Sequence, residues 1–359
     1  MSAFANHGDG ILPPKVSVVI PCRNAARVIA TCLDSLVASD YPKDRLEVRV
    51  VDGMSDDGTR AVVTEYGKRF PFIVLERNPK TTQQSALNIG IRGATGDVII
   101  RMDAHTSFVP SHISQCVTHL LDSGADTVGG RLMTVPREDT VIGRAIAIAM
   151  SERFGVGNSP FRIRRDPDDL TPRWVDTVPY ACYRRTVFER VGLFNEHLDR
   201  SEDAEFHRRM KEAGCRTLFV PSLVSYYHAR SDLKSFWLHA VDNGRWAVLP
   251  TRYTGRLEVS LRHLVPLGFV SVVGALAVLA LFKPEGGYLL AAVLVAYGLV
   301  NLAVSAGIAM RERDARLAVV LPVVFSLLHV GYGLGSFGSL GTVAASRWPE
   351  SFLSSHHAK

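Results

Sequence analysis

The chain has 359 residues, of which 47% are hydrophobic and 21% are charged, a balance that excludes a disordered protein and allows one large domain with an additional part. Its formal net charge is +6, but no long Lys/Arg run or basic–aromatic array occurs, so we expect no nucleic-acid partner and instead a membrane surface or an anionic ligand. The five cysteines are scattered without a CxxC pair, which argues against a disulfide framework and fits a reducing cytosol.

The first part of the chain alternates between predicted strands and helices. Residues 1–14 form a predicted N-terminal tail without the pattern of a signal peptide, so the domain that follows is expected in the cytoplasm. Apolar runs predict strands at 15–21, 46–52, 72–75 and 98–103, and helical patterns lie between them at 28–37, 59–69 and 84–92. Such alternation with short loops predicts an α/β fold with a doubly wound, mostly parallel sheet.

Three of these strands end in residues that can carry chemistry. Pro21 ends the first strand and is followed by Arg23 and Asn24, Asp52 ends the second, and Asp103-Ala-His ends the fourth. In a doubly wound sheet these ends can meet at one crevice, where ligands bind. A carboxylate and an imidazole two positions apart could share one divalent ion, and the ion could hold a pyrophosphate. A strand end that merely happens to be polar is the alternative.

Glycine-rich phosphate loops are missing from the sequence. It contains neither GxxxxGK nor a strand-linked GxGxxG, which disfavours P-loop NTPases and NAD enzymes.

The order and spacing of these motifs resemble a family 2 glycosyltransferase of the GT-A fold over residues 16–247. The motifs that carry the resemblance are Val18-Val-Ile-Pro21 with Asn24, Val51-Asp-Gly-x-Ser-x-Asp-Gly-Thr59, and Asp103-x-His105. The resemblance implies that the nucleoside of a nucleotide sugar is surrounded by Pro21, Arg23, Asn24, Asp52 and Asp57.

The resemblance also implies a divalent cation. Asp103 and His105 take the place of the family's DxD, which binds the cation and the nucleotide diphosphate. His105 departs from the second Asp of that motif and leaves the choice between Mn²⁺ and Mg²⁺ open, although imidazole suits Mn²⁺ somewhat better. Arg101 is a candidate phosphate contact, or alternatively a solvated surface charge.

The middle of the chain is expected to serve the acceptor. Residues 126–131 look like a strand that ends in Gly129-Gly130, and paired glycines permit close approach to a sugar ring, although a simple turn is the alternative. Residues 140–150 are apolar on several sides and predict a helix that lies on a bilayer surface or is buried in the core.

A second motif, Arg200-Ser-Glu-Asp-Ala-Glu205, opens a predicted helix that runs to Gly214. Ser201 is a candidate N-cap, and carboxylates in a first turn are often only stabilising. The resemblance points further, because the Glu-Asp pair matches the family's ED signature. It implies that Asp203 is the catalytic base, that Glu202 or Glu205 supports it, and that transfer inverts the anomeric centre.

Arg245 and Trp246 keep the spacing of the Gln-x-x-Arg-Trp motif of processive family members, but Asp242 replaces the Gln. The resemblance implies that Arg245 pairs with the diphosphate and that the acceptor sugar stacks on Trp246. The replaced Gln puts processive synthesis in doubt. An ordinary interfacial Trp is the alternative.

The last part of the chain predicts a membrane domain at 264–346. The apolar stretches 264–282, 288–310 and 317–346 are long enough to cross a bilayer, although the third also fits one span plus an interfacial segment. The remaining predicted divisions are a cytoplasmic GT-A domain at 15–250, an interfacial linker at 251–263 and a C-terminal tail at 347–359.

Basic residues predict the orientation. Arg252, Arg256 and Arg262 precede the first span, and Arg311, Arg313 and Arg316 separate the second from the third, whereas Lys283 is alone in the other loop. The positive-inside rule therefore places the catalytic domain on the cytoplasmic side of a multi-pass cell-membrane protein.

The whole chain is similar to the succinoglycan-type exopolysaccharide glucosyltransferases, through Asp103-Ala-His105, Phe154-Gly-Val-Gly157 and Asn243-Gly-Arg-Trp246. The similarity implies transfer of glucose from UDP-glucose to a hydroxyl of a polyprenyl-diphosphate-linked glycan. One alternative is a polyprenyl-monophosphate glycosyltransferase, whose acceptor is already an anion and needs no base. Another is a non-catalytic membrane subunit that binds nucleotide sugars.

Overall fold

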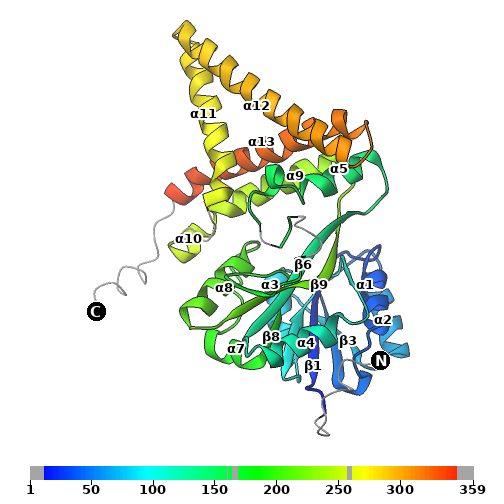
Figure 1. Cartoon of the computed structure of the whole chain (residues 1–359). Helices are drawn as coiled ribbons and strands as arrows, with labels where there is room; N and C mark the ends of the chain where they lie inside the picture. Colours follow the sequence, from blue (N-terminus) through cyan, green and yellow to red (C-terminus); the bar gives the residue numbers. More distant parts are fainter. Residues whose placement is uncertain (1–11, 160, 164–168, 257–260, 346–359) are drawn as a thin grey trace, which may run out of the picture. The chain divides into compact units, whose positions relative to one another are not determined.

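The computed structural model describes residues 12–159, 161–163, 169–256 and 261–345 (Figure 1). It divides into two compact units, the first formed by Met1–Met133 and Arg165–His228 and the second by Thr134–Arg164 and Ala229–Lys359. Most of the predicted N-terminal tail, part of the linker and all of the C-terminal tail lie outside the described residues.

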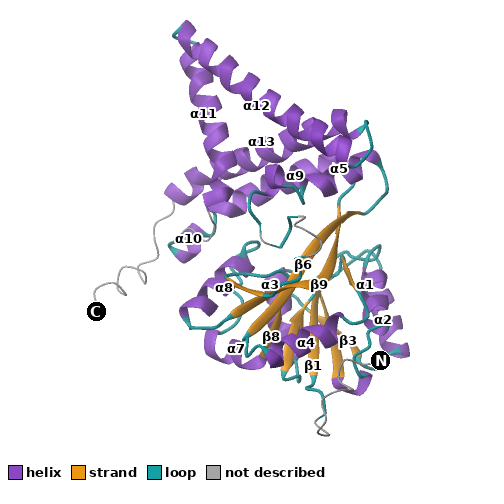
Figure 2. Cartoon of the chain, in the orientation of Figure 1, coloured by secondary structure: helices purple, strands orange, loops and turns teal. Residues whose placement is uncertain are grey.

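A mixed sheet forms the centre of the first unit (Figure 2). Its strands follow the order β3-β2-β1-β4-β8-β6-β9-β5, with β7 beside β9. The strands are β1 (Val16–Cys22), β2 (Leu46–Asp52), β3 (Ile73–Arg77), β4 (Val98–Arg101), β5 (Thr106–Phe108), β6 (Thr127–Pro136), β7 (Arg173–Val175), β8 (Cys182–Arg184) and β9 (Thr217–Ala229). The predicted α/β fold is confirmed, and its parallel part is β3-β2-β1-β4, whereas β8 pairs antiparallel with both β4 and β6.

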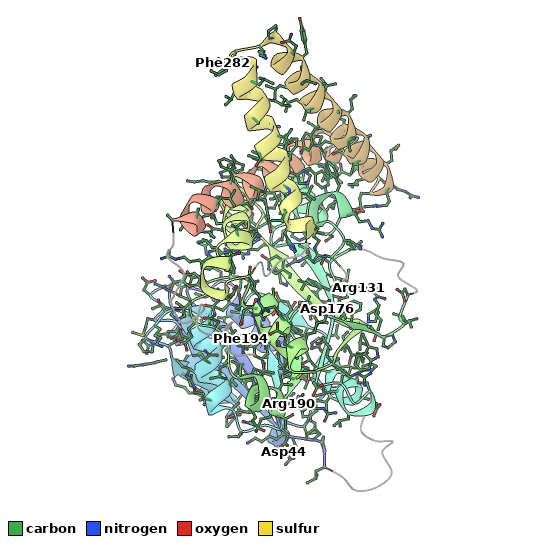
Figure 3. All side chains as sticks on the ribbon, turned by 90° about the vertical axis from the view of Figure 1, so that its left-hand side faces the viewer. Asp44, Arg131, Asp176, Arg190, Phe194 and Phe282 are labelled. Atoms are coloured by element: carbon green, nitrogen blue, oxygen red, sulfur yellow. The ribbon has the colours of Figure 1, made fainter. Side chains whose placement is uncertain are left out.

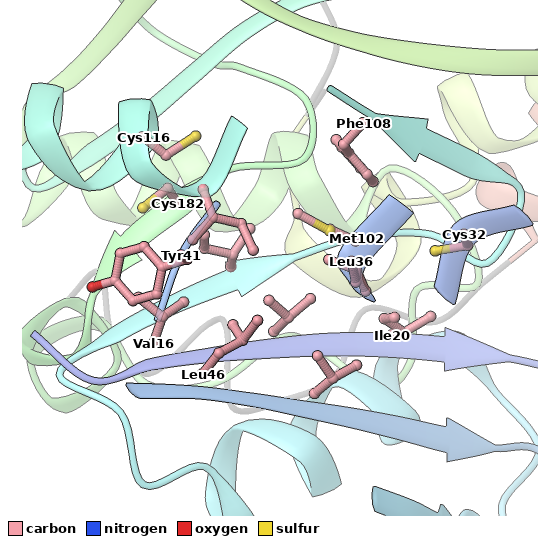
Figure 4. Close-up of a cluster of buried hydrophobic side chains, with 14 of the residues drawn as sticks. Val16, Ile20, Cys32, Leu36, Tyr41, Leu46, Met102, Phe108, Cys116 and Cys182 are labelled. Carbon is pink, nitrogen blue, oxygen red and sulfur yellow. The ribbon is translucent and has the colours of Figure 1, made fainter. Parts of the chain in front are cut away.

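Helices cover both faces of this sheet. They are α1 (Ile29–Val37), α2 (Thr59–Arg69), α3 (Gln83–Gly93), α4 (His112–Asp122), α7 (Arg185–Val191) and α8 (Glu202–Glu212). Every residue of β1 is buried, which explains its continuous apolar sequence. One face of β1 packs, through Val16 and Ile20, in a cluster that includes Leu36 of α1 and Met102 (Figure 4). The strand ends that carry polar residues are thereby held on a rigid core. All five cysteines are free and buried.

The two glycines of β6 correct one element boundary. The predicted strand was expected to end at Gly129-Gly130, but β6 continues to Pro136 and both glycines are buried. A Cβ at Gly130 would overlap the Leu223 carbonyl of β9, and a Cβ at Gly129 would overlap Val178. Close approach of protein to protein is therefore sufficient reason for both glycines, and their predicted contact with an acceptor sugar stays untested.

We expect Gly130→Ala to lower stability rather than acceptor affinity. Overpacking of a tight interior typically costs about 1–3 kcal/mol, which corresponds to a melting temperature lower by roughly 5 °C in a domain of this size. Thermal unfolding of the purified protein measures the effect. Gly307→Ala is the control, because nothing lies within 4 Å of a Cβ at that position. An unchanged melting temperature with a raised acceptor KM would contradict the packing explanation.

The second unit contains the remaining helices. They are α5 (Val141–Ala149), α6 (Arg153–Val156), α9 (Leu233–Val248), α10 (Thr251–Thr254), α11 (Val265–Ala280), α12 (Pro284–Arg311) and α13 (Leu317–Ala344). Three segments, Arg262–Ala280, Pro284–Arg311 and Leu317–Ala344, are long and apolar enough to cross a membrane. The predicted apolar helix after residue 140 is α5, which is largely buried. Since α5 and α9 group with these segments, the domain limit at residue 250 stays a prediction.

Candidate functional site

The ends of β1 and β2 are joined into one polar loop cluster. Cys22 pairs in register with Asp52, which places the residues after each strand side by side. The Asn24 amide donates to Ser55 Oγ at 2.8 Å, and the Asp56 amide donates to Asn24 Oδ1 at 3.1 Å. Arg23 and Asn24 are exposed beside this junction, whereas Pro21 is buried.

Two carboxylates hold this loop cluster in shape. Asp52 is fully buried, and its oxygens accept from the Ser55 amide at 3.1 Å and from Ser55 Oγ at 2.5 Å. Asp57 is exposed and accepts from the Thr59 hydroxyl and from the Ala26 amide, contacts that lower the pKa of its carboxyl. Both acids therefore have structural partners, and their predicted contacts with a nucleoside stay untested. A contact with Asp52 would require its loop to shift.

Several connections of the first unit contain unusual backbone conformations. Among the described residues of the first unit, five that are not glycine have positive φ: Asn24 (50°), Met54 (60°), Thr81 (61°), Tyr180 (44°) and Ser201 (64°). Such conformations cost of order 1–3 kcal/mol each and are typical of functional sites. Asn24 and Met54 directly follow β1 and β2, Tyr180 precedes β8, and Ser201 precedes α8. The strain thus lies in the connections that present the predicted site residues.

The main charged cluster surrounds Arg101, the last residue of β4. Arg101 is only 5% exposed. One terminal nitrogen of its guanidinium contacts the Asp203 carboxylate, and the other lies 2.9 Å from Glu202 Oε1 and 3.6 Å from Asp103 Oδ1. The guanidinium also lies over the Phe194 ring, 5.9 Å from its centroid. The alternative of a solvated surface charge is therefore wrong for Arg101, and its predicted contact with a phosphate stays untested.

This cluster joins distant parts of the chain. Asp103 follows β4, whereas Glu202 and Asp203 open α8, a hundred residues later. Three carboxylates face one cation, so the cluster has a net charge of −2 when all of them are ionised. Such a charge favours the approach of a further cation.

The start of α8 explains how the acids reach Arg101. Ser201 occupies the N-cap position in a left-handed conformation, without the side-chain capping hydrogen bond expected from the sequence. Glu205 points to a different partner, since both of its oxygens bind Arg209 at 2.7 and 3.0 Å. Glu205 is therefore paired with Arg209, whereas Glu202 shares Arg101 with Asp203, and the predicted support of the base by either acid stays untested.

Burial controls the protonation of these acids. It raises the pKa of Glu202 to about 7, although the nearby Arg101 opposes the rise. Loss of hydration likewise raises the pKa of Asp203, and Arg101 again opposes it. His207 donates through Nδ1 to the Asp203 carbonyl at 2.8 Å, and burial lowers the pKa of this imidazole to about 4. His207 is therefore neutral and anchors the first turn of α8.

The raised pKa of Glu202 predicts a pH dependence of stability. Between pH 4.5 and about 7, folded Glu202 keeps a proton that the unfolded chain has lost, so the free energy of unfolding falls as pH rises through this window. Glu202→Gln removes this contribution, and we expect its melting temperature to decline less than that of the wild type over the window. Glu212→Gln, an exposed site on the same helix, is the control. Parallel curves for Glu202→Gln and the wild type would contradict the assignment.

Asp103 and His105 form the candidate metal site. Asp103 Oδ2 and His105 Nε2 are 4.0 Å apart, with side chains 15% and 35% exposed. Adjacent ligands of one octahedral ion lie about 3 Å apart at bond lengths of about 2.0–2.2 Å, so the two side chains would have to approach by about 1 Å to share an ion. Among the described residues no group of three or more His, Cys, Asp or Glu could hold a metal. Asp103 and His105 thus offer two candidate ligands, and their predicted binding of a divalent cation stays a prediction.

Two neighbours of this pair were not predicted from the sequence. Gln83, the first residue of α3, donates to Asp103 Oδ1 at 3.3 Å. The Tyr227 ring meets His105 edge-on with centroids 5.1 Å apart. Neither residue belongs to a motif. Tyr227 reaches His105 because β9 pairs with β5, the strand that begins directly after His105.

Arg245 and Trp246 lie within α9, in the second unit. Arg245 is exposed and Trp246 is half-buried. The neighbouring Gly244 lies against the Tyr332 backbone of α13. Their predicted roles toward the diphosphate and the acceptor sugar stay predictions.

Residues 17–192 match the family described as "Glycosyl transferase family 2". The chain is 29% identical over 259 residues to the succinoglycan biosynthesis protein ExoA of Rhizobium meliloti (strain 1021), which covers 71% of this chain and 75% of that protein. It is 24% identical over 332 residues to a dolichyl N-acetyl-alpha-D-glucosaminyl phosphate 3-beta-D-2,3-diacetamido-2,3-dideoxy-beta-D-glucuronosyltransferase of Methanococcus voltae, with 90% and 97% covered.

Among solved structures, the chain is similar to the mannosyltransferase PcManGT of Pyrobaculum calidifontis in complex with GDP-Man and Mn²⁺. The TM-score is 0.59 at 20% identity, and the match covers 92% of this chain and 88% of that one. This likeness concerns the fold.

Proposed function

The chain is a glycosyltransferase with a family 2 domain over residues 17–192 and a GT-A-like fold, and from this premise we propose that it is a membrane-anchored, inverting enzyme. It transfers a sugar, glucose from UDP-glucose, to a hydroxyl of a polyprenyl-diphosphate-linked glycan. The observation that carries the proposal is the cluster in which Arg101 holds Asp203 beside Asp103. The name of the Methanococcus voltae relative, which acts on a dolichyl-linked sugar phosphate, supports a lipid-linked acceptor, and that of the Rhizobium meliloti relative supports a role in exopolysaccharide synthesis.

Asp203 acts as the general base in this proposal. An acceptor hydroxyl is a poor nucleophile until a carboxylate within hydrogen-bond reach accepts its proton. The acceptor oxygen forms a bond with the anomeric carbon as the bond to the β-phosphate oxygen breaks, and the electron pair leaves with the nucleoside diphosphate. The proton moves to Asp203. Attack opposite the leaving group inverts the anomeric centre in one step.

Asp103 and His105 would hold a divalent cation once their side chains approach each other by about 1 Å. When bound, the cation neutralises charge on the leaving diphosphate. Arg101 contacts both the Asp103 and the Asp203 carboxylates, so it fixes the distance between the proposed diphosphate site and the base.

His105→Ala should weaken metal activation. The loss of an imidazole ligand is expected to raise the Mn²⁺ concentration for half-maximal activity by about tenfold or more, since even outer-sphere changes cost 10–100-fold. His105→Asp restores a DxD pair and should shift the preference from Mn²⁺ toward Mg²⁺, which favours oxygen ligands. Metal titration of the turnover rate measures both effects. His197→Ala, an exposed histidine, is the control. Unchanged metal curves for both His105 variants would exclude His105 as a ligand.

Two ion pairs within the second unit support the proposed orientation. Arg144 of α5 binds Asp314 at 2.7 Å, and Arg311 binds Glu152 at 2.5 Å, so the loop between α12 and α13 is attached to the segment that contains α5 and α6. This segment is inserted between β6 and β7, and its described residues contain no helix long and apolar enough to cross a bilayer. The basic loop and the sheet therefore share one side, which the positive-inside rule assigns to the cytoplasm.

One assay tests the proposed function. The detergent-solubilised enzyme is incubated with a panel of nucleotide sugars, membrane lipid extract and Mn²⁺ or Mg²⁺, and the products are identified by mass. A hexose added to a lipid-linked glycan, from UDP-glucose alone, is the expected result. Transfer to a polyprenyl monophosphate would replace the acceptor proposed here. Tight binding of UDP-glucose without hydrolysis or transfer would instead support a non-catalytic subunit.

A further inference from the structure

Helix α13 is packed differently from the two other apolar helices. Within an apolar stretch of 18 residues, 39% of the residues of α13 are buried inside the protein, against 11% in α12 and none in Arg262–Ala280. Figures 1 and 3 show the second unit from two directions, and in both α13 runs across the base of the hairpin formed by α11 and α12. Phe282 lies at the far end of this hairpin (Figure 3) and is 78% exposed.

Most of the length of α13 contacts helices that do not cross a membrane. Before its first turn, Asp314 binds Arg144 of α5. Farther along, His329 Nε2 donates to the Phe154 carbonyl of α6 at 2.7 Å, and Ser336 Oγ donates to the Gly244 carbonyl of α9 at 2.9 Å. From Leu317 to Ser336 a helix advances about 29 Å, close to the full thickness of a hydrocarbon core.

Helix α9 is unsuited to the interior of a bilayer. Its 16 residues span about 24 Å, less than the core thickness, and include charged or ionisable side chains throughout its length. These side chains are Lys234, His239, Asp242 and Arg245. A charge at the centre of a bilayer costs about 2.5–3.5 kcal/mol on insertion scales. If α13 crossed the membrane, its contact with α9 would carry these groups through the core.

We infer that α13 does not cross the membrane but lies along its surface on the catalytic side, with its outer face in contact with lipid. This rests on the proposal that α11 and α12 span the bilayer. The C-terminus of the chain then returns to the catalytic side. The outer face of α13 contacts the interfacial zone of the bilayer. In that zone α9 and α13 form a continuous layer beneath the two spans.

The exposed face of α13 has the chemistry that this location requires. Five exposed apolar residues occupy it: Val319, Val323, Leu334, Phe337 and Leu340. At 100° per residue they fall within about 120° of the helix circumference, which makes one continuous apolar stripe. Arg316 precedes the helix at the end where the phosphate groups of lipids would lie. The same stripe would suit a span, so the packing against α9 decides between the two locations.

Helix α13 contacts the first turns of α11 and, in α12, residues from the middle of that helix onward. Gly333 lies against Pro266 and Val270 of α11, and the His329 ring accepts from Tyr297 of α12 at 3.0 Å. The Asn301 amide donates to the Pro322 carbonyl at 3.0 Å. A helix parallel to the spans would be expected to continue these contacts toward Phe282.

Epitope tags test the inference in membranes that contain the full-length protein. One tag follows Lys359, and a second is inserted beside Lys283. A protease is added to one side of sealed vesicles at a time. The Lys359 tag should be removed from the catalytic side and the Lys283 tag from the opposite side, each at least about tenfold faster than from the other side, because a bilayer excludes polar chains. Removal of the Lys359 tag from the side that removes the Lys283 tag would overturn the inference. Inaccessibility of the Lys283 tag from the side away from the catalytic unit would instead reject the two spans themselves.

Depth measurements provide a second readout. Single cysteines at Val319, Val323, Leu334 and Leu340 carry a fluorophore, since the five native thiols are buried. Lipids with quenchers at shallow and deep positions are compared for each variant. A surface helix should show shallow quenching at all four positions. Quenching that becomes deepest at Leu334 and shallow again toward Leu340 would show a span and overturn the inference.

Discussion

Asp203→Asn is expected to lower kcat by about a thousandfold, within the range that general-base catalysis contributes. The amide is almost the same shape as the carboxylate and can still accept a hydrogen bond from Arg101, so the fold should persist. It cannot accept the proton of the acceptor hydroxyl. Initial rates with saturating UDP-glucose and lipid-linked acceptor measure the loss of kcat. The melting temperature shows whether the fold persists.

The control for this experiment is Glu212→Gln at the other end of α8, where the side chain is 51% exposed and pairs with Arg208. It should keep both activity and stability. Survival of more than a tenth of kcat in Asp203→Asn would exclude the carboxylate as base. If that activity requires a polyprenyl monophosphate, the acceptor is already ionised and the alternative reaction is favoured.

Arg101→Met is expected to lower both stability and activity, because it leaves three neighbouring carboxylates without their cation. Removing one partner of a buried ion pair costs about 3–5 kcal/mol, or roughly 10 °C in the melting temperature. The loss of the contact between Arg101 and Asp203 should also lower kcat by about a hundredfold, since Asp203 is no longer held at its position.

Arg101→Lys separates charge from geometry. An ammonium group restores a positive charge but cannot bind Glu202 and Asp203 through two separate nitrogens, as the guanidinium does. We expect most of the stability to return while kcat stays low and donor KM changes little. Arg92→Met, on the exposed side of α3, is the control. Full activity in Arg101→Lys at wild-type stability would show that only the charge matters.

Several elements could be predicted from the sequence because their signals are local. The apolar run of β1, the strand that ends in Asp52, and the helix that begins with Glu202-Asp203 all follow from patterns within a few residues. The extension of β6 beyond Gly130 could not be predicted in this way, because a glycine pair in sequence resembles a turn. Only the approach of Leu223 from another strand explains why glycine is needed there.

The sequence by itself determined the family resemblance, the alternation that builds the sheet, and the three apolar stretches, since each depends on residue order and composition. The tertiary structure alone decided that Arg101 joins acids a hundred residues apart, and that Glu205 turns to Arg209 instead. It also decided that α13 packs along α9. The physical reason is that charge pairing and helix packing depend on distances in space, which the chain reaches only after distant strands and helices have come together.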